Sequence, residues 1–181
     1  VIKGDVTITT DATGTADDGQ VHFSTTDSTI LGHTTGDRKL TILTGHGDLE
    51  LDGAIGGTST KTLTKLHLNA TAGAGASFTV PKIGADATTA GTAGATVIGN
   101  TASGDITLSA ATYAFGGGDT SIISGGDVVM SANDAEITMT TGHTLTIDTT
   151  TGTNKGLKGT KDLKLTATGN LATIDIKGDI L

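Results

Sequence analysis

A short phrase made of one apolar residue, one other residue and a second apolar residue recurs along the whole chain. Its twelve copies are VTI at 6, VHF at 21, LTI at 40, LEL at 49, LHL at 66, FTV at 78, ITL at 106, VVM at 128, ITM at 137, LTI at 145, LKL at 163 and IDI at 174. In eleven of the twelve the middle residue is polar or charged, so each phrase has an apolar face and a polar face. This period of two is typical of a short β-strand with one buried side.

The residues between these phrases are mostly the turn formers Gly, Asp, Asn, Ser and Thr. Gly-Asp precedes several of the phrases, as in GDVTITTDA at 4, GDLELDGAI at 47, GDITLSAAT at 104 and GDVVMSAND at 126. Successive phrases begin 8 to 28 residues apart, and the values cluster loosely near 9 and 18. A coil of about 20 residues with two or three short strands, stacked on the next coil at about 4.8 Å, would produce such spacings. Since no segment has sustained helical spacing, we expect an all-β fold, a parallel β-helix (β-solenoid).

An antiparallel β-sandwich is the alternative, because Gly- and Thr-rich strands without disulfides also suit fibre subunits that polymerise by strand donation. We expect residues 1–181 to form a single solenoid domain or a fragment of a longer repeat array, with a Gly/Ala/Thr-rich excursion at about 70–102. The phrase IKGDV at 2 returns as IKGDI at 176. This return fits one period of a longer array or a unit that stacks end to end, and also the chance reuse of a common corner.

Composition limits the kind of core and the kind of partner. Hydrophobic residues make up 35% of the chain but aromatic residues only 2%, so the interior must consist mainly of aliphatic side chains. We expect these to include Val6, Ile8, Leu49, Leu51, Ile106, Leu108, Leu145, Ile147, Leu163 and Leu165.

A net charge of -8 with a single arginine argues against nucleic acid as a partner. Cysteine is absent, which excludes disulfides and thiolate chemistry, and no apolar run is long enough to predict membrane insertion.

The phrases GDVTITTDATG, GDLELDGAIG, GDITLSAAT and KDLKLTATGNL resemble the coil repeats of filamentous-haemagglutinin-type exoproteins. The likeness covers most of the chain outside residues 70–102. Similar phrases also occur in autotransporter passengers and in Thr-rich surface-layer and RTX-type proteins. The resemblance implies a right-handed parallel β-helix shaft of a secreted bacterial surface protein, located outside the cell or on its surface.

Two acidic stretches are candidate calcium sites. GGGDTSIISGGDVVM at 116 partly matches the calcium-binding nonapeptide of RTX proteins, with Asp119 and Asp127 as ligands, although these residues are 8 rather than 9 apart. DATGTADDG supplies Asp11, Asp17 and Asp18 without EF-hand spacing. In both cases an ordinary solvated turn is the alternative interpretation.

Two of the five histidines occupy outward positions by the same alternation. His22 and His67 are the middle residues of VHF and LHL, so both should point to solvent, and a histidine ladder would require their strands to be neighbours. GHGDLELD places His46, Asp48, Glu50 and Asp52 at two-residue intervals, hence on one face of a strand. That line has the groups to hold a cation, and a solvated acidic face is the alternative interpretation.

Catalytic motifs are absent from the sequence: it has no G-x-S-x-G elbow, no H-E-x-x-H and no phosphate loop. We therefore expect a non-enzymatic structural or adhesive protein that forms part of a bacterial surface filament or layer. End-to-end self-association and a cell-surface glycan or protein receptor are the expected partners. A calcium-stabilised lattice subunit and, less favoured, a polysaccharide-acting β-helix enzyme are the alternatives.

Overall fold

A computed structural model describes residues 1–10, 19–24, 29–33, 38–45, 47–56, 61–68, 78–84, 91–116, 118–139, 142–159, 163–167 and 172–181. Within these residues the regular structure is entirely β-strand, and every strand pairing is parallel. The predicted parallel β-solenoid is confirmed, and the alternative antiparallel sandwich is wrong. The described residues contain no helix long and apolar enough to cross a membrane.

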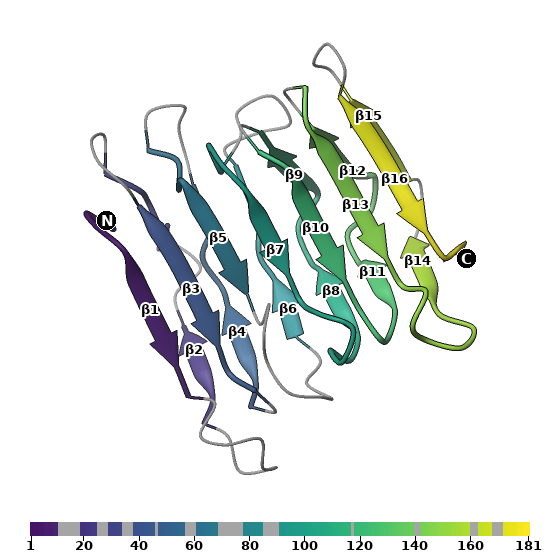
Figure 1. Cartoon of the computed structure of the whole chain (residues 1–181), viewed down its shortest axis with the longest axis horizontal. Helices are drawn as coiled ribbons and strands as arrows, with labels where there is room; N and C mark the ends of the chain where they lie inside the picture. Colours follow the sequence, from purple (N-terminus) through teal and green to yellow (C-terminus); the bar gives the residue numbers. More distant parts are fainter. Residues whose placement is uncertain are drawn as a thin grey trace.

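Three sheets form the sides of the solenoid (Figure 1). The first contains, in spatial order, β1 (Val6–Thr9), β3 (Lys39–Leu43), β5 (Lys65–Leu68), β7 (Thr96–Ile98), β10 (Thr120–Ile123), β13 (Thr144–Asp148) and β16 (Thr173–Lys177). The second contains β2 (Val21–Phe23), β4 (Leu49–Leu51), β6 (Phe78–Val80), β8 (Ile106–Leu108), β11 (Val128–Met130), β14 (Gly156–Gly159) and β17 (Asp179–Ile180). The third contains β9 (Thr112–Phe115), β12 (Ala135–Met139) and β15 (Leu163–Ala167).

Isolated bridges continue the third side toward the N-terminus, linking Ile30 to Ile55, Ile55 to Ile83 and Ile83 to Tyr113. Each coil therefore passes through three sides, and the chain then forms the next strand of the first sheet, which pairs with the previous strand of that sheet. In register Val6 lies opposite Leu40, whereas Ile106 lies opposite Val128, so the length of a coil varies along the solenoid. The coils are also longer than predicted from the sequence, because the corners between the sides vary in length.

All twelve sequence phrases lie within strands of the structure. Five other strands, β7, β9, β10, β14 and β17, were not predicted. Several of these carry Thr or Gly where the phrase requires an apolar residue. Thr96 and Thr120, for example, occupy inward positions of β7 and β10 in register with each other. Strands β6 and β7 fall within the stretch 70–102. Strand β6 pairs with β4 and β8 in the second sheet, and β7 pairs with β5 and β10 in the first.

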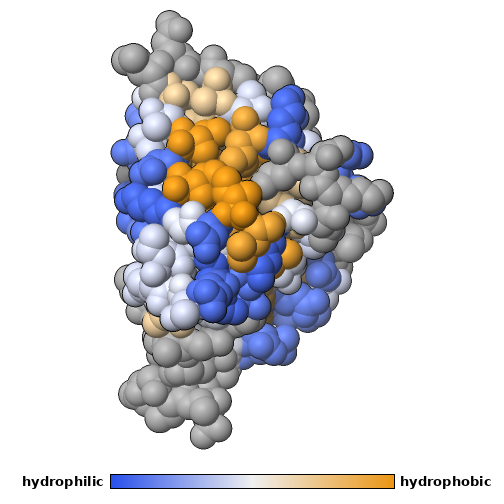
Figure 2. All heavy atoms as spheres, turned by 90° about the vertical axis from the view of Figure 1, so that its right-hand side faces the viewer, coloured by the Kyte–Doolittle hydropathy of each residue, from blue (hydrophilic) through white to orange (hydrophobic). Residues whose placement is uncertain are grey.

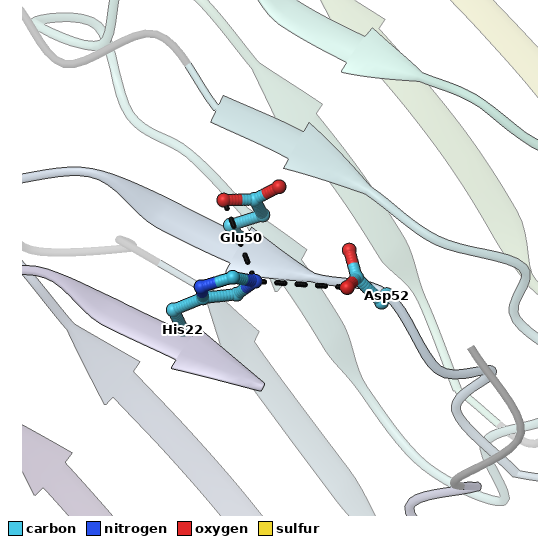
Figure 3. Close-up of side chains that lie close together, drawn as sticks. All are labelled: His22, Glu50 and Asp52. Carbon is cyan, nitrogen blue, oxygen red and sulfur yellow. Dashed lines mark ion pairs between the residues drawn. The ribbon is translucent and has the colours of Figure 1, made fainter. Parts of the chain in front are cut away.

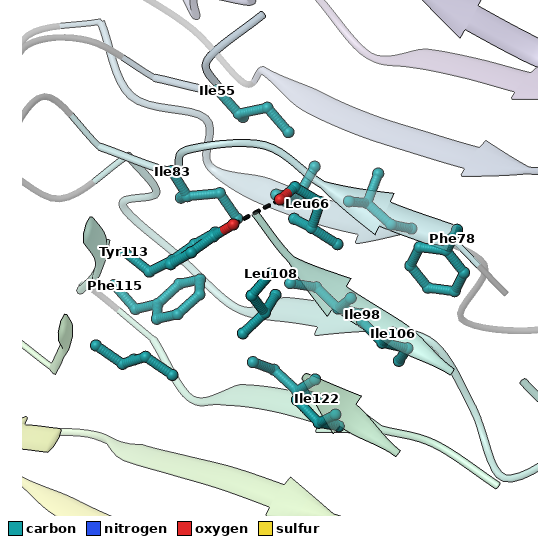
Figure 4. Close-up of a cluster of buried hydrophobic side chains, with 14 of the residues drawn as sticks. Ile55, Leu66, Phe78, Ile83, Ile98, Ile106, Leu108, Tyr113, Phe115 and Ile122 are labelled. Carbon is teal, nitrogen blue, oxygen red and sulfur yellow. Dashed lines mark hydrogen bonds between the residues drawn. The ribbon is translucent and has the colours of Figure 1, made fainter. Parts of the chain in front are cut away.

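The core is a set of apolar columns that run along the solenoid axis. On the first sheet one column passes through Ile42, Leu68, Ile98, Ile122 and Ile147, each of which is fully buried. Figure 4 shows part of this interior, with labelled side chains from the three sides pointing toward one another. Each inward side chain contacts those one rung above and below, so burial depends on having a rung on both sides.

The expected core residues are largely confirmed, and the exceptions lie in the terminal rungs. Six of the ten are at most 3% exposed: Leu49, Leu51, Ile106, Leu108, Leu145 and Ile147. Val6 is 36% exposed, and Ile8 and Leu165 are partly buried. The side chain of Leu163 lies outside the described part of the structure. End residues remain exposed because a neighbouring rung covers them on one side only.

The largest fully buried side chain among the described residues is Tyr113, on the third side. Its hydroxyl donates a hydrogen bond to the carbonyl of Val80 at 2.5 Å and accepts one from the N–H of Ala110 at 3.0 Å. Burial raises the pKa of Tyr113 well above its ordinary value, so the phenol stays protonated and can serve as a donor. The polar end of this ring therefore ties the third side to the end of β6.

The repeated Gly-Asp phrase occupies one corner of the coil. Gly47-Asp48, Gly104-Asp105 and Gly126-Asp127 directly precede β4, β8 and β11, which are all strands of the second sheet. A Cβ at Gly126 would lie 2.7 Å from the backbone nitrogen of Asp105 and 2.8 Å from the carbonyl carbon of Gly104. Glycine is needed at this position because the corners of adjacent rungs approach too closely for a side chain.

Both ends of the described solenoid expose parts of the core. At the N-terminal end Phe23 is 39% exposed, whereas Leu51, its partner in the next rung, is 3% exposed. At the C-terminal end Ile180 is 67% and Leu181 is 58% exposed. Figure 2 looks onto this end and shows apolar residues gathered in the middle of the face, with polar residues around them.

Two inward threonines provide a test of the column packing. Thr96 and Thr120 are 0% and 1% exposed, and neither Oγ1 has a hydrogen-bond partner among the described residues. Valine has the same shape without the hydroxyl, so Thr120→Val should increase the free energy of unfolding by about 1 kcal/mol in urea denaturation. Thr146→Val, at an outward position of β13, is the matched control and should change it little. A loss of stability in Thr120→Val would contradict the column packing.

Candidate functional site

Three side chains with metal-ligating atoms converge on the outer face of the second sheet (Figure 3). His22 Nε2 lies 3.5 Å from Glu50 Oε2 and 3.6 Å from Asp52 Oδ2. One potential ligand atom from each residue lies within 4.8 Å of the others. The side chains are 38%, 51% and 30% exposed, so this His22–Glu50–Asp52 cluster is open to solvent.

The parallel register explains how the cluster forms. His22 is the middle residue of β2 and Glu50 the middle residue of β4, and the two are direct partners across the sheet. Neighbouring strands lie about 4.8 Å apart, so their outward side chains meet. Asp52 follows two residues after Glu50 and points to the same side, because Leu49 and Leu51 face the core. The predicted outward orientation of His22, Glu50 and Asp52 is confirmed.

The cluster borders a surface hollow of about 600 Å³. Its polar lining includes Asp48, Glu50, Asp52 and Lys82, and its apolar lining includes Phe78. The acidic line predicted from GHGDLELD therefore forms one wall of this hollow. His46, the first member of that predicted line, lies outside the described residues.

A second charged group lies at the Gly-Asp corner. Asp105 Oδ1 accepts a hydrogen bond from the N–H of Asp127 at 2.8 Å, and Asp127 Oδ1 accepts one from the N–H of Gly156 at 3.0 Å. Each carboxylate thus binds the backbone of the next rung. Lys158 Nζ lies 2.7 Å and Lys155 Nζ 3.5 Å from Asp127 Oδ2, so the negative charge is compensated by ammonium groups.

The electrostatics of Asp127 follow from these contacts. The residue is 6% exposed, and burial alone would raise the pKa of its carboxyl. The hydrogen bonds from Lys158 and from the N–H of Gly156, together with the charges of Lys155 and Lys158, outweigh burial and lower the pKa below its ordinary value. Asp127 is therefore ionised at neutral pH and serves to join rungs.

The predicted calcium ligands fall into two groups. Asp11, Asp17 and Asp18 lie outside the described residues. Asp119 precedes β10 on the first sheet, whereas Asp127 precedes β11 on the second, so the two lie at different corners of the coil. Asp119 accepts a hydrogen bond from the N–H of Thr144 at 3.0 Å and lies 3.6 Å from His143 Nδ1. The described contacts of these two carboxylates are with protein donors, and no residue is shared between them.

His22 and His67 lie on different sheets and form no ladder. His67, on β5 of the first sheet, has Thr41 and Val97 as its direct neighbours across the strands. Burial, and then the charge of Lys65, lowers the pKa of His67, so its imidazole is neutral at pH 7. The convergence of His22 with Glu50 and Asp52 was not predicted from the sequence. The sequence does contain a signal, because His22 in VHF at 21 and Glu50 in LELD at 49 are both outward residues in the middle of a strand. This signal predicts contact only once the two strands are known to pair.

No protein-family model matches the chain, and neither the curated proteins nor the solved structures give a match.

Replacement of Asp127 tests the charged corner. Asp127→Asn should reduce the free energy of unfolding by about 1 kcal/mol at pH 7, because it removes the charge that binds two lysines. The native pKa of Asp127 is lowered, so its contribution is present above the unfolded-state pKa and is lost as the pH falls through the native value. The free energies of unfolding of the wild type and Asp127→Asn should thus converge at strongly acidic pH.

The control is Asp175→Asn, whose 47% exposed side chain pairs with Lys177 on the surface. An equal loss in both variants at pH 7 would contradict the special role of Asp127.

Proposed function

We propose that this chain is a non-enzymatic structural segment of an extracellular bacterial filament or surface layer, and that it extends by stacking its rungs end to end on a second copy. The observation that carries the proposal is the pair of open ends. Among the described strands, β1 and β2 have partners on one side only, β3 and β4, and β16 and β17 likewise pair only with β13 and β14. Unpaired strand edges next to exposed apolar residues are a template for further strands.

The two ends match in the phase of their apolar columns. Ile174 and Ile176 of β16 continue the columns of Leu145 and Ile147. At the other end Val6 and Ile8 begin the same two columns, since they pair with Leu40 and Ile42. A second copy stacked head to tail would therefore place aliphatic residues over aliphatic residues, with backbone hydrogen bonds continuing in the same parallel direction. Such a heterologous contact does not close on itself and gives an open filament.

The location outside the cell and the adhesive role rest on the sequence. The Gly-Asp phrases resemble coil repeats of filamentous-haemagglutinin-type exoproteins, in which the solenoid is the shaft of a secreted adhesin. The outward column of the first sheet is rich in hydroxyls, with Thr7, Thr41, Ser121 and Thr146 among its members. This lateral face is the surface that a filament would offer to a glycan or protein receptor.

Self-association provides the test. Sedimentation velocity between about 1 and about 100 µM should show a rise in mass with concentration, and negative-stain electron microscopy should show rods. Ile180→Lys puts a charge on the exposed C-terminal end and should abolish the assembly, since an ammonium group would be buried there without a partner.

Thr107→Lys is the matched control, because Thr107 is an outward residue in the middle of β8 and should not touch a stacked copy. Its assembly should equal that of the wild type. A wild-type chain that stays monomeric over the whole concentration range, or equal assembly of Ile180→Lys, would refute end-to-end stacking.

A further inference from the structure

We propose that the His22–Glu50–Asp52 cluster binds a divalent transition-metal ion of the zinc class and that the ion links strands β2 and β4. This site is distinct from the corners assigned to calcium by the sequence analysis. It is also independent of end-to-end stacking, because the three side chains lie on a lateral face of the solenoid (Figure 3).

The distances fit one ion. Zinc lies about 2.0–2.2 Å from imidazole nitrogen and carboxylate oxygen, so two ligands of one tetrahedral ion are about 3.4 Å apart. The two distances from His22 Nε2 are 3.5 Å to Glu50 and 3.6 Å to Asp52. The three ligand atoms lie within 4.8 Å of one another, so rotation of the two exposed carboxylate side chains would bring all three to the coordination distance of one ion.

The ligand chemistry selects the metal. An imidazole nitrogen with two carboxylates suits zinc and its first-row neighbours, whereas calcium prefers six to eight oxygen ligands. Two carboxylates also supply two negative charges, which neutralise a divalent ion. Since the three side chains are 30–51% exposed, the remaining coordination position faces solvent.

The backbone holds the ligands in place. His22 and Glu50 are direct partners in the parallel ladder, and the buried Leu49 and Leu51 fix which side of β4 faces outward. His143 lies at ion-pair distance from one carboxylate, that of Asp119. His67 has uncharged direct neighbours across its strands. The convergence of two carboxylates on one imidazole therefore distinguishes His22 from these two histidines.

The position of the cluster also gives the ion a structural effect. It lies on β2, the edge strand of the second sheet, where Phe23 is 39% exposed. An ion that joins β2 to β4 adds a link between the edge strand and the next rung. Metal binding should consequently stabilise the N-terminal end of the solenoid against unfolding.

Isothermal titration calorimetry of the full chain with zinc chloride tests the site. We expect zinc to bind this site with a 1:1 stoichiometry and to raise the thermal unfolding midpoint, and EDTA should reverse the increase. His22→Gln and Glu50→Gln should each weaken zinc binding by at least about 10-fold, because each removes a ligand. Calcium chloride should neither bind the site nor compete with zinc.

Two matched controls separate this site from adventitious binding by surface histidines. His143→Gln removes an imidazole beside a single carboxylate, and His67→Gln removes one from a different sheet, so both should bind zinc as the wild type does. No heat of binding at about 1 mM zinc, or equal binding by His22→Gln and the wild type, would overturn the proposal. Loss of binding in His143→Gln instead of His22→Gln would do the same. Circular dichroism of each variant establishes that the β-solenoid is retained, as expected for side chains that point away from the core.

Discussion

The stacking of one rung on the next is the interaction on which the whole structure depends. Parallel strands place the same residue position of successive rungs about 4.8 Å apart, and the backbone hydrogen bonds run along the solenoid axis. The apolar columns are a consequence, since Ile42, Leu68 and Ile98 can bury one another only if the register is kept. A one-residue slip would turn a whole strand's inward side chains to solvent. The ends are exposed for the same reason, because the last described rung in either direction is covered on one side only.

The corner before the second sheet explains why the chain repeats Gly-Asp. Glycine is required where adjacent corners approach closely, as Gly126 does over Asp105. The aspartate then satisfies a backbone donor of the next rung, as Asp105 does for Asp127 and Asp127 for Gly156. A corner leaves N–H groups outside the regular ladder, and an unpaired buried donor is costly. The two residues of the phrase thus solve a steric and a hydrogen-bonding problem at the same place.

The sequence was sufficient for most of the strands because its period-two signal is local, and the recurrence of the phrase favoured stacked parallel coils. Each apolar phrase identifies a strand and also the side that faces the core, as in Leu49, Glu50 and Leu51. The signal failed in β7 and β10, where Thr96 and Thr120 take inward positions that elsewhere hold aliphatic residues. Threonine has nearly the shape of valine, so an inward threonine packs well but resembles a surface residue in the sequence. Coil length was underestimated because corners vary in length and leave no periodic trace.

The candidate site was only partly predictable, because it depends on contacts between rungs. The alternation within LELD places Glu50 and Asp52 on one face, but only the pairing of β2 with β4 brings His22 to them. The same physics operates on the third side, where Lys164 lies directly opposite Glu136 and its Nζ is 2.8 Å from the carboxylate. In a parallel ladder, outward residues at equal positions of neighbouring strands are closer together than successive outward residues of one strand. Chemistry on the surface of a solenoid is therefore built across rungs.

The apolar columns fix the register, and the register fixes which outward side chains meet. A lateral cluster such as that of His22 therefore needs no element outside the repeat. A change of coil length in one rung alters the corner and leaves these neighbours in place, provided that the strand register is kept.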